Sequence, residues 1–488
     1  MQLNVSDIVT LYRPEKCVRR VFLQASGTDR REPTEWELLL EELGRRHEQL
    51  HLTTFKGLID VSSGNLDERI ELTSAAISDK APTIYQGVFQ ARLPGSDSFI
   101  LGIPDFLIRE NEGYTIRECK LARHADEKNH PEILRQLELY AWLFEQTCGE
   151  RPIAIEAFLG SNELVRIESY DYSDAFNELA VVRQAKGQGE EPYAPVGWSK
   201  CSHCRYRQYC WSKAEEDNSV DLVYGVDQGA AIALNQIGTR TIKELLRNFH
   251  EDTLAELKRP YGKRMQKIGK SATSILEHAR ALDSGKIRQV STFDFPAVNN
   301  LVMFDLEGMP PQIDDLDKVY LWGMQVFGES PSEYLSSTSS FDEEGDREGW
   351  FQFLRLAKPI LNAYPEIPFV HWAHYEPTKI RLYMERYGDQ NGIANRVLNS
   401  CVDLLPLTKS AFVLPLHSYS LKMVERLAGY ERTMDEFGGE WSMAQYIRAV
   451  ESKNPDLRAK VMDQILKYNE EDLAATWAVL QWLKRLSS

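Results

Sequence analysis

Two carboxylates and a lysine lie close together in the sequence between positions 102 and 120. Asp105 follows a proline, and Glu118 and Lys120 are two positions apart in a later segment that reads as a strand. Successive side chains of a strand point to opposite faces, so Glu118 and Lys120 share a face and Cys119 points away. Two carboxylates and an ammonium group on one face suit a divalent metal ion and a phosphate. A lone Glu-x-Lys is often only a solvated pair, so the chemistry depends on what flanks it.

The flanking segments add three polar residues on predicted helices. His47 lies in a predicted helix over 35–50, upstream of the two carboxylates. Gln136 and Tyr140 lie in a predicted helix over 132–146, where positions four apart share a face. The ordered set resembles the RecB-like branch of the PD-(D/E)XK nucleases: His47, Asp105, Glu118, Lys120, Gln136 and Tyr140.

The resemblance implies a restriction-endonuclease-like α/β domain and a role for each of these residues. Asp105, Glu118 and His47 would bind Mg²⁺ or Mn²⁺. Lys120 would position the attacking water and stabilise the charge that develops on the phosphate. Gln136 and Tyr140 would orient the DNA or the groups around the metal. Strands are predicted over 99–108, 114–121, 152–159 and 164–170.

The cysteines predict a second kind of metal site. The chain has seven, and Cys201, Cys204 and Cys210 follow a C-x2-C-x5-C spacing. No secretory signal and no apolar run near the length of a membrane span are recognisable, so we expect a reducing cytoplasm and no membrane partner. There, such a cluster is more typical of metal binding than of disulfides. Three ligands need a fourth, and Cys17 is the best placed.

A distant cysteine before the nuclease segment, followed by a triad after it, resembles the iron–sulfur subgroup of RecB-like nucleases. That subgroup includes the CRISPR-associated RecB-like exonucleases. The resemblance implies that Cys17, Cys201, Cys204 and Cys210 hold a 4Fe-4S cluster that joins the two ends of the domain. Structural zinc is the alternative, since it also accepts four thiolates. Only one C-x2-C knuckle is present, which favours iron–sulfur. Cys119, Cys148 and Cys401 are expected to be ordinary thiols.

A second acidic set begins near position 300. Asp305 and Glu307 share one face of a predicted strand over 300–308, which a strand over 319–327 is expected to pair with. Glu376 follows another apolar strand, and Tyr468 and Asp472 are one helical turn apart.

This order resembles the tyrosine-bearing DEDD exonucleases of the RNase H-like superfamily. The resemblance implies that Asp305, Glu307, Glu376 and Asp472 hold two divalent ions and that Tyr468 orients the attacking water. One departure is that Glu376 stands where Asp is usual, and Asp403 is an alternative ligand. A catalytically degenerate binding module is the alternative for this segment.

Between the two acidic sets, residues 221–286 are predicted to be helical. Residues 234–242 resemble a helix-hairpin-helix, whose glycine turn would present backbone N–H groups to a phosphate. The stretch from Lys258 to Lys270 has six basic residues and no acidic one. It predicts either a contact with a DNA backbone or the solvated basic face of a linker. The acidic run 342–348 is predicted to be a solvated loop.

Composition sets the frame for these motifs. At 488 residues, with 43% hydrophobic and 27% charged residues, the chain is predicted to be a globular protein of about three domains. We place a RecB-like nuclease domain at 1–217, a helix-hairpin-helix-like segment at 218–290 and an RNase H-like DEDD domain at 291–488. A net charge of −16 does not exclude nucleic-acid binding, which needs only a local basic surface.

The whole pattern resembles an uncharacterised bacterial family of predicted RecB-like nucleases and predicts an α/β multidomain, metal-dependent nuclease. We expect an exonuclease of DNA, with single strands favoured, in DNA processing or repair. The alternatives are an RNA-processing exonuclease and a nucleic-acid-binding scaffold with one or both sites inactive. Some relatives continue into a helicase, whereas this sequence has no Walker-type Gly-Lys-Ser/Thr loop, so strand separation would require a helicase partner.

Overall fold

The structure is a computed structural model that describes residues 1–111, 113–262, 264–309, 317–340, 342–433 and 438–487. It divides into two compact units. Unit 1 comprises Met1–Pro33 and Glu37–Ser212, and unit 2 comprises Thr34–Trp36 and Lys213–Ser488. None of the described helices combines the length and apolar character that crossing a membrane requires.

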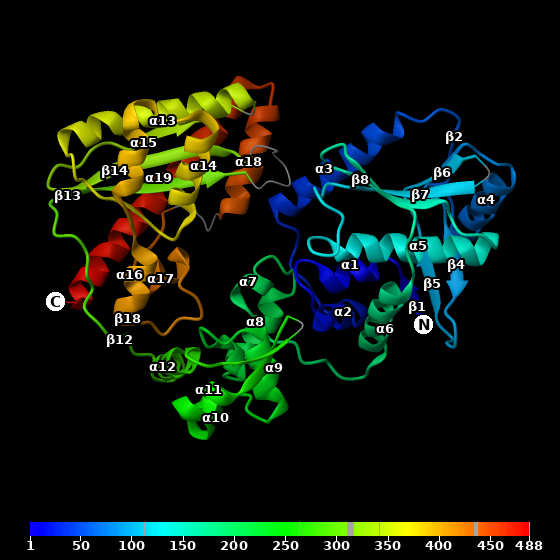
Figure 1. Cartoon of the computed structure of the whole chain (residues 1–488), viewed down its shortest axis with the longest axis horizontal. Coiled ribbons are helices and arrows are strands. Elements are labelled where there is room, and N and C mark those ends of the chain that lie inside the picture. Colours follow the sequence, from blue (N-terminus) through cyan, green and yellow to red (C-terminus); the bar gives the residue numbers. More distant parts are fainter. Residues whose placement is uncertain (112, 263, 310–316, 341, 434–437, 488) are drawn as a thin grey trace. The chain divides into compact units, whose positions relative to one another are not determined.

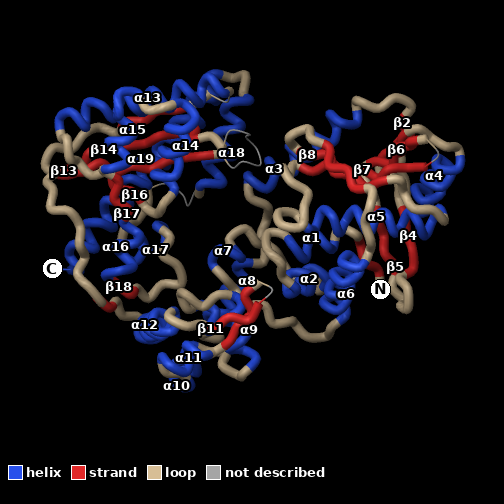
Figure 2. The backbone as a smooth tube through the Cα atoms, viewed as in Figure 1, coloured by secondary structure: helices blue, strands red, loops and turns tan. Residues whose placement is uncertain are grey.

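Unit 1 encloses one helix between two sheets (Figures 1 and 2). The larger sheet has the order β2-β3-β6-β7-β8-β9 and the smaller one β1-β5-β4. Helix α5 (Pro131–Cys148) contacts β4 of the smaller sheet and β7 and β8 of the larger one. Every residue of α5 from Glu132 to Phe144 is buried, as expected of a helix inside the core. The strands are β1 (Gln2–Asn4), β2 (Leu58–Asp60), β3 (Thr83–Tyr85), β4 (Phe89–Arg92), β5 (Phe99–Gly102), β6 (Phe106–Glu110), β7 (Gly113–Lys120), β8 (Ala154–Leu159) and β9 (Leu164–Ile167).

The single strand predicted over 99–108 is wrong. The chain forms β5 and β6, which belong to different sheets, and crosses between them at Ile103–Asp105. Pro104 has no N–H to give to a ladder, and the Asp105 N–H donates to the Glu118 side chain instead. The break therefore places Asp105 where the chain passes from one sheet to the other.

The other helices of unit 1 surround these sheets. They are α1 (Asp7–Tyr12), α2 (Val18–Ala25), α3 (Glu35–Leu52), α4 (Leu66–Ser78), α6 (Ser173–Gly187), α7 (Trp198–Cys201) and α8 (Arg207–Glu216), the first residues of α3 and the last of α8 being grouped with unit 2. Helices α1 and α6 contact α5, and α2 contacts α1 and α6. The N-terminal helices and the last helix before the cysteine triad thus belong to one packed layer.

Unit 2 contains a five-stranded sheet with the order β15-β14-β13-β16-β17. Strand β13 (Asn300–Gly308) pairs antiparallel with β14 (Val319–Gly328) and parallel with β16 (Phe369–His371). Its alternate residues face opposite layers. Val302 and Phe304 join the core formed with α13 (Glu343–Ala363), α14 (Tyr375–Tyr387) and α15 (Ile393–Asn399). Leu301 and Met303 pack with residues of α19 (Pro455–Ser487).

The remaining elements of this part complete the two layers. They are β12 (Arg288–Gln289), β15 (Leu335–Thr338), β17 (Cys401–Asp403), β18 (Phe412–Val413), α16 (Leu404–Ala411), α17 (Leu421–Leu427) and α18 (Gly439–Glu451). The loop predicted over 342–348 is wrong for most of its length, because α13 begins at Glu343 with Asp342 as its N-cap. Acidic residues suit the first turn of a helix, whose N-terminus carries a partial positive charge. Asp346 is fully buried and accepts hydrogen bonds from Tyr387 (2.8 Å) and Arg386 (2.9 Å).

Residues 220–285 form a separate small core that includes Leu234, Leu245, Leu254 and Ile275. The helices are α9 (Gln228–Gln236), α10 (Ile242–Asn248), α11 (Glu251–Glu256) and α12 (Ser271–Ser284). Gly238 has a φ of +80° in the turn between α9 and α10, a conformation that favours glycine. The purely helical prediction is wrong at one place, because the basic stretch forms the hairpin β10 (Lys258–Tyr261) and β11 (Arg264–Lys267).

Candidate active sites

The first acidic group lies at the end of β7 and at the sheet crossing that precedes β6. The Asp105 N–H donates to Glu118 Oε1 (3.1 Å), and the Cys119 N–H donates to Asp105 Oδ2 (2.8 Å). Lys120 Nζ lies 2.8 Å from Glu118 Oε2. Strand alternation directs Glu118 and Lys120 to one face, as the sequence predicted. The structure therefore brings Asp105, Glu118 and Lys120 together.

Burial dominates the electrostatics of this group. Burial and the negative charge of Glu118 raise the pKa of Asp105 well above its usual range. Burial alone would lower the pKa of Lys120, but the charges of Glu118 and Asp105 outweigh it and raise that pKa. Lys120 therefore stays cationic, and its single positive charge faces two carboxyl groups, Asp105 and Glu118. A divalent ion would relieve the remaining repulsion.

Helix α5 adds Gln136 and Tyr140 on one face. Gln136 is 4% exposed, and its Oε1 is buried without a hydrogen-bond partner among the described residues. Burial, followed by the charges of Glu118 and Asp105, raises the pKa of Tyr140. The Tyr140 ring packs directly on Gly102, where a Cβ would come within 2.9 Å of its Cδ1. Tyr140 therefore faces the carboxylates, and Gln136 offers an amide oxygen with no other use.

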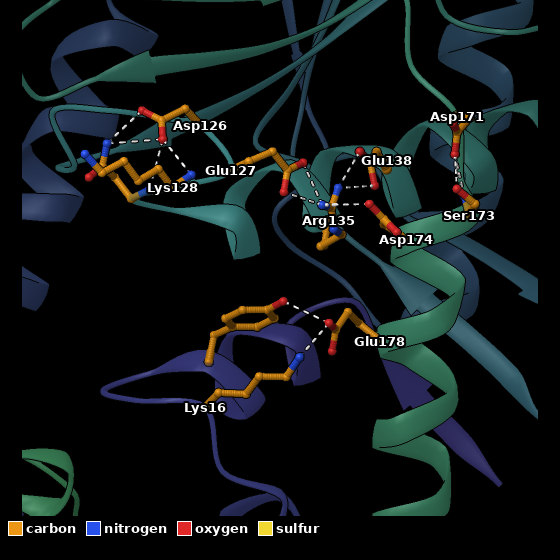
Figure 3. Close-up of polar contacts among 12 residues, drawn as sticks. Lys16, Asp126, Glu127, Lys128, Arg135, Glu138, Asp171, Ser173, Asp174 and Glu178 are labelled. Carbon is orange, nitrogen blue, oxygen red and sulfur yellow. Dashed lines mark hydrogen bonds and ion pairs between the residues drawn. The ribbon is translucent and has the colours of Figure 1, made fainter. Parts of the chain in front are cut away.

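A buried arginine on α5 pairs with three carboxylates, two of which are exposed (Figure 3). Arg135 is 4% exposed and donates to Glu138 on its own helix (2.8 Å). It also donates to Glu127 (2.6 Å) and Asp174 (3.3 Å). Figure 3 shows Arg135 between these three carboxylates, which come from two helices and the loop before α5. These charge-assisted hydrogen bonds tie the helix that carries Gln136 and Tyr140 to α6 and to the loop before α5.

His47 and Glu48 lie on α3 and point in different directions. His47 Nε2 lies 3.2 Å from the Phe158 carbonyl oxygen, and its ring stacks on the Phe158 ring. Glu48 accepts hydrogen bonds from Tyr85 (2.7 Å) and Gln86 (3.2 Å), and its charge helps to raise the pKa of Asp105. Glu48 therefore acts electrostatically on the acidic group, whereas the described contacts of His47 are with Phe158. Successive residues of a helix are rotated by about 100°, so His47 and Glu48 cannot point in the same direction. The sequence analysis selected His47 because a histidine fits the motif.

The second acidic group lies on the α19 face of the unit 2 sheet. One oxygen from each of Asp305, Glu307 and Asp472 lies within 4.8 Å of the others. Asp305 and Glu307 share a face of β13, and Asp472 comes from α19, which packs against β13. No other such group of three His, Cys, Asp or Glu side chains occurs among the residues that the structure describes. Within the described part of the chain, it is therefore the candidate group for a divalent metal site.

Glu376 is the fourth acid of this group. It is 3% exposed and lies in the first turn of α14, whereas the sequence placed it at the end of a strand. His371 Nδ1 lies 3.3 Å from Glu376 Oε2. Burial raises the pKa of Glu376, and the charges of Asp472, Glu307 and Glu376 add to the effect of burial on Asp305. Four neighbouring acids therefore resist carrying four charges without a cation.

The alternative ligand Asp403 has another task. Its Oδ1 accepts the backbone N–H groups of Ala373 (2.9 Å) and Leu405 (3.0 Å), and it is the N-cap of α16. An N-cap oxygen satisfies helix donors that would otherwise be unmatched. Asp403 thus serves the turns beside the site, and the structure favours Glu376 as the fourth acid.

Polar side chains that the motif did not include surround the second group. Asn469 donates to Asp305 Oδ2 (2.7 Å) and accepts from Tyr334 (2.8 Å). Arg432 donates to Asp472 Oδ1 (2.5 Å), and Glu425 holds the same guanidinium at 2.7 Å and 2.9 Å. Asn469 lies within the predicted motif helix, one residue after Tyr468, and could have been found there. Arg432 comes from a loop without a pattern, and no sequence signal pointed to it.

Tyr468 lies beside these charges at the same site. It is 5% exposed, and burial followed by the charge of Asp472 raises its pKa. The guanidinium of Arg432 lies 5.9 Å from the centre of its ring. Tyr468 therefore remains a neutral hydrogen-bond donor at the edge of the acidic group.

The four predicted cluster ligands line one cavity of unit 1. Cys17, at the N-cap of α2, faces Cys201, Cys204 and Cys210 across it. Burial raises the pKa of Cys210 to about 11, and the neighbouring Cys17 and Cys204 contribute. Arg19, Arg20, Lys200 and Arg207 line the same cavity. Thiols near one another and ringed by cations suit an anionic metal–thiolate centre.

Comparison with known proteins identifies both halves of the chain. A family model of the PD-(D/E)XK nuclease superfamily matches residues 15–211, and one of the RNase H superfamily matches residues 302–484. The chain joins a PD-(D/E)XK nuclease domain to an RNase H superfamily domain. No curated protein matches the sequence. A solved structure titled "Crystal structure of SSO0001" aligns with 36% of this chain and 97% of its own, at 18% identity and a TM-score of 0.20.

Each domain contains one of the two acidic groups. Asp105, Glu118 and Lys120 lie in the PD-(D/E)XK nuclease domain, and Asp305, Glu307, Glu376 and Asp472 lie in the RNase H superfamily domain. Both superfamilies comprise metal-dependent enzymes that hydrolyse phosphodiester bonds. The chain is therefore a nuclease, and its substrates are nucleic acids.

Proposed function

We propose that this chain is a RecB-like exonuclease of DNA that acts on single strands, in DNA processing or repair. The observation that carries the proposal is the group formed by Asp305, Glu307, Asp472 and Glu376, in which four carboxylates gather and all but the half-buried Asp305 are buried. Carboxylates at this density suit the two metal ions of an in-line phosphoryl displacement. The Asp105–Glu118–Lys120 group supports a second, separate hydrolytic site.

At the first site, each residue has a role that its surroundings support. A divalent ion held by Asp105 and Glu118 would supply Lewis acidity and an activated water. Lys120 stays protonated beside Glu118, so it holds positive charge where the phosphate gains negative charge. The free Oε1 of Gln136 accepts a hydrogen bond from a substrate or a metal-bound group. The charge of Glu48 acts on Asp105, so Glu48 is proposed beside His47 as a further metal ligand from α3.

At the second site, we assign metal binding to the four acids and orientation of the attacking water to Tyr468. Asp305, Glu307, Glu376 and Asp472 would hold Mg²⁺ or Mn²⁺, which would supply Lewis acidity toward the phosphate. Tyr468 remains a neutral donor and orients the attacking water. Asn469 fixes the rotamer of Asp305 through its 2.7 Å hydrogen bond. The longer side chain of Glu376 makes this site the weaker of the two.

The cysteines are proposed to hold a 4Fe-4S cluster. A single zinc ion at about 2.3 Å from each sulfur would hold its thiolates about 3.8 Å apart. Among the described residues, no three cysteine sulfurs lie within 4.8 Å of one another. Four thiols that line one cavity at a wider spacing fit a larger centre between them. The wide spacing supports iron–sulfur over zinc.

A panel of end-labelled single- and double-stranded DNA and RNA, with Mg²⁺ or Mn²⁺, tests the proposed activity. We expect fastest loss of single-stranded DNA, a ladder that shortens from an end, and no cleavage when the divalent ion is chelated. Circular single strands separate the alternatives, because an exonuclease leaves them intact. Faster cleavage of RNA would make the chain an RNA-processing enzyme, and no cleavage of any substrate would make it a binding scaffold.

A further inference from the structure

The hairpin β10–β11 places basic and aromatic side chains on an exposed surface outside both acidic sites. Its register pairs Lys258 with Lys267, Pro260 with Met265 and Tyr261 with Arg264. All four residues of β11 are exposed. Tyr261 and Met265 are 62% and 63% exposed, among the most exposed large hydrophobic side chains that the structure describes. Lys263, between the two strands, lies outside the described residues.

The base of the hairpin is firmly attached, although its outer surface is free. Ile268 is 5% exposed in the small core, and its N–H donates to the Leu257 carbonyl (3.0 Å). Arg259 forms a 2.6 Å ion pair with Asp227, the N-cap of α9. The Pro260 carbonyl packs so closely on Gly229 of α9 that no side chain fits there. The hairpin is therefore a rigid projection whose exposed residues are held in position.

The basic side chains of the hairpin repel one another in the free protein, which lowers its stability. Lys258 and Lys267 lie directly opposite each other, and like charges in that position repel. Glu256 forms a 2.5 Å ion pair with Lys267, but both side chains are more than half exposed, so the pair is weak. Arg264 and Lys270 add two more cations. A polyanion would turn this repulsion into attraction, in a chain whose net charge is otherwise −16.

The aromatic ring makes the surface more specific than a basic patch. The Arg259 guanidinium lies 5.0 Å from the centre of the Tyr261 ring, on the same face of the hairpin. This contact orients the ring, while most of its surface remains open to solvent. Flat aromatic faces beside cations bind unpaired bases, because each base has a face that stacks and a phosphate that pairs with a cation. Acidic peptides use the cations but gain little from an oriented ring.

We propose that β10–β11 is a binding surface for single-stranded nucleic acid. In this arrangement one base stacks on Tyr261, and Arg264, which pairs with Tyr261 across the hairpin and shares its face, contacts a neighbouring phosphate. This inference rests on the proposed function for its choice of ligand. It goes beyond that function by assigning a binding site away from both acidic groups.

Binding of a fluorescent 20-nucleotide oligo(dT) to the full chain tests the proposal, measured by anisotropy with the divalent ion chelated so that the probe stays intact. We expect Tyr261→Ala to raise Kd about 5- to 150-fold, the range for one base–aromatic stack, and Tyr261→Phe to bind like the wild type. Arg264→Gln should reduce the salt slope by about 0.7, the value for one phosphate contact, whereas Lys258→Gln, on the opposite face of the hairpin, should leave the slope nearly unchanged. Lys286→Gln, an exposed lysine of the same segment, and Tyr364→Ala, an exposed tyrosine elsewhere, are the matched controls.

Three results would overturn the proposal. They are a wild type that does not bind the probe, a Tyr261→Ala variant that binds unchanged, and loss of binding with the charge variants alone. The last would make the hairpin a general polyanion surface, which poly-glutamate competition would show directly. Hydrolysis of short substrates in Mn²⁺ is measured separately. A chain that binds through the hairpin but cleaves nothing would refute the proposed function while leaving this inference intact.

Discussion

Arg432 lies beside the second acidic group but belongs to none of the sequence motifs. Its guanidinium is held by Glu425 and reaches Asp472, while Nη1 is buried without a hydrogen-bond partner among the described residues. Desolvation would lower its pKa, but Glu425 and Asp472 raise it, so the charge is permanent. A fixed cation beside metal-binding acids, with one N–H unused, is suited to a phosphate oxygen.

We therefore expect Arg432→Gln to lower kcat of the RNase H site about 100-fold with a smaller change in KM, because it removes a charge used mainly in the transition state. The rate is measured in a Glu118→Ala background, which silences the other site. Arg432→Lys should recover part of the rate, and Arg355→Gln, an exposed ion-paired arginine of α13, should change nothing. A Gln variant with normal kcat but lower thermal stability would assign Arg432 a structural role alone.

The sequence predicts the direction of a side chain correctly where local strand geometry alone determines that direction. Glu118 and Lys120, or Asp305 and Glu307, share a face because strand alternation requires it. It could not choose between His47 and Glu48, because the direction of a helical side chain depends on how the helix rotates against its sheet. It could not find Arg432 at all, because a loop residue reaches its site through tertiary folding rather than through spacing.

At the scale of elements, the motif strands and helices were predictable and the exceptions have physical causes. The helices over 35–50 and 132–146 and the paired strands near 300 and 320 were confirmed to within a few residues. The predicted strand over 99–108 failed because one apolar run serves two sheets, with a proline at the crossing. The basic stretch failed because β10–β11 is a short hairpin amid helices, which its composition does not reveal.

The packing of α3 on the sheet predicts a pH effect on stability. His51 stacks on Phe158 at 4.0 Å, and Arg117 lies 3.2 Å from its Nε2. Burial first, and then Arg117, lower the pKa of His51 to about 4. The unfolded chain binds that proton at an ordinary histidine pKa of about 6.5, so this contribution to stability is lost as pH falls from 6.5 towards 4.

His51→Phe keeps the ring stack and removes the titration. We expect unfolding measured at pH 7.5 and at pH 4.5 to show a smaller loss of stability in the variant than in the wild type, by about 1–3 kcal/mol. His124→Phe, a histidine of the loop between β7 and α5, serves as the control and should follow the wild type. Equal losses in the wild type and His51→Phe would mean that His51 titrates normally in the folded chain.

The cysteines make a prediction about how the ends of the PD-(D/E)XK domain are joined. Cys17 begins α2, and the triad lies on α7, in the turn after it and on α8, so a centre between them links segments about 190 residues apart. Anaerobically purified protein should be brown and should contain iron and sulfide. Replacing any one of Cys17, Cys201, Cys204 and Cys210 by Ala should bleach it and lower the melting temperature. Cys148→Ala should leave the colour unchanged, and stoichiometric zinc without iron would contradict the cluster.

At the scale of the whole molecule, the two candidate active sites of the chain differ in what surrounds their acids. The first combines two carboxylates with a half-buried lysine, whereas the second combines four carboxylates with an arginine. Each set is complete within its own domain, and each lies on its own sheet. Separate frameworks imply that damage to one site leaves the other folded and able to bind its metal.

We therefore expect Glu118→Ala to abolish the activity of the first site alone and Asp305→Ala that of the second alone. A metal site that loses a carboxylate loses the ion or its geometry, and with it most of the rate. If the proposed exonuclease assignments hold, the RNase H site would degrade from the 3′ end and the first site could act from the 5′ end. Substrates labelled at opposite ends then report each variant separately.

The activity left in Glu118→Ala should be weak and should favour Mn²⁺, because Glu376 replaces the usual aspartate. If Glu118→Ala alone abolishes cleavage of every DNA and RNA substrate, the RNase H domain serves in binding, and its four acids hold metal without turning over substrate.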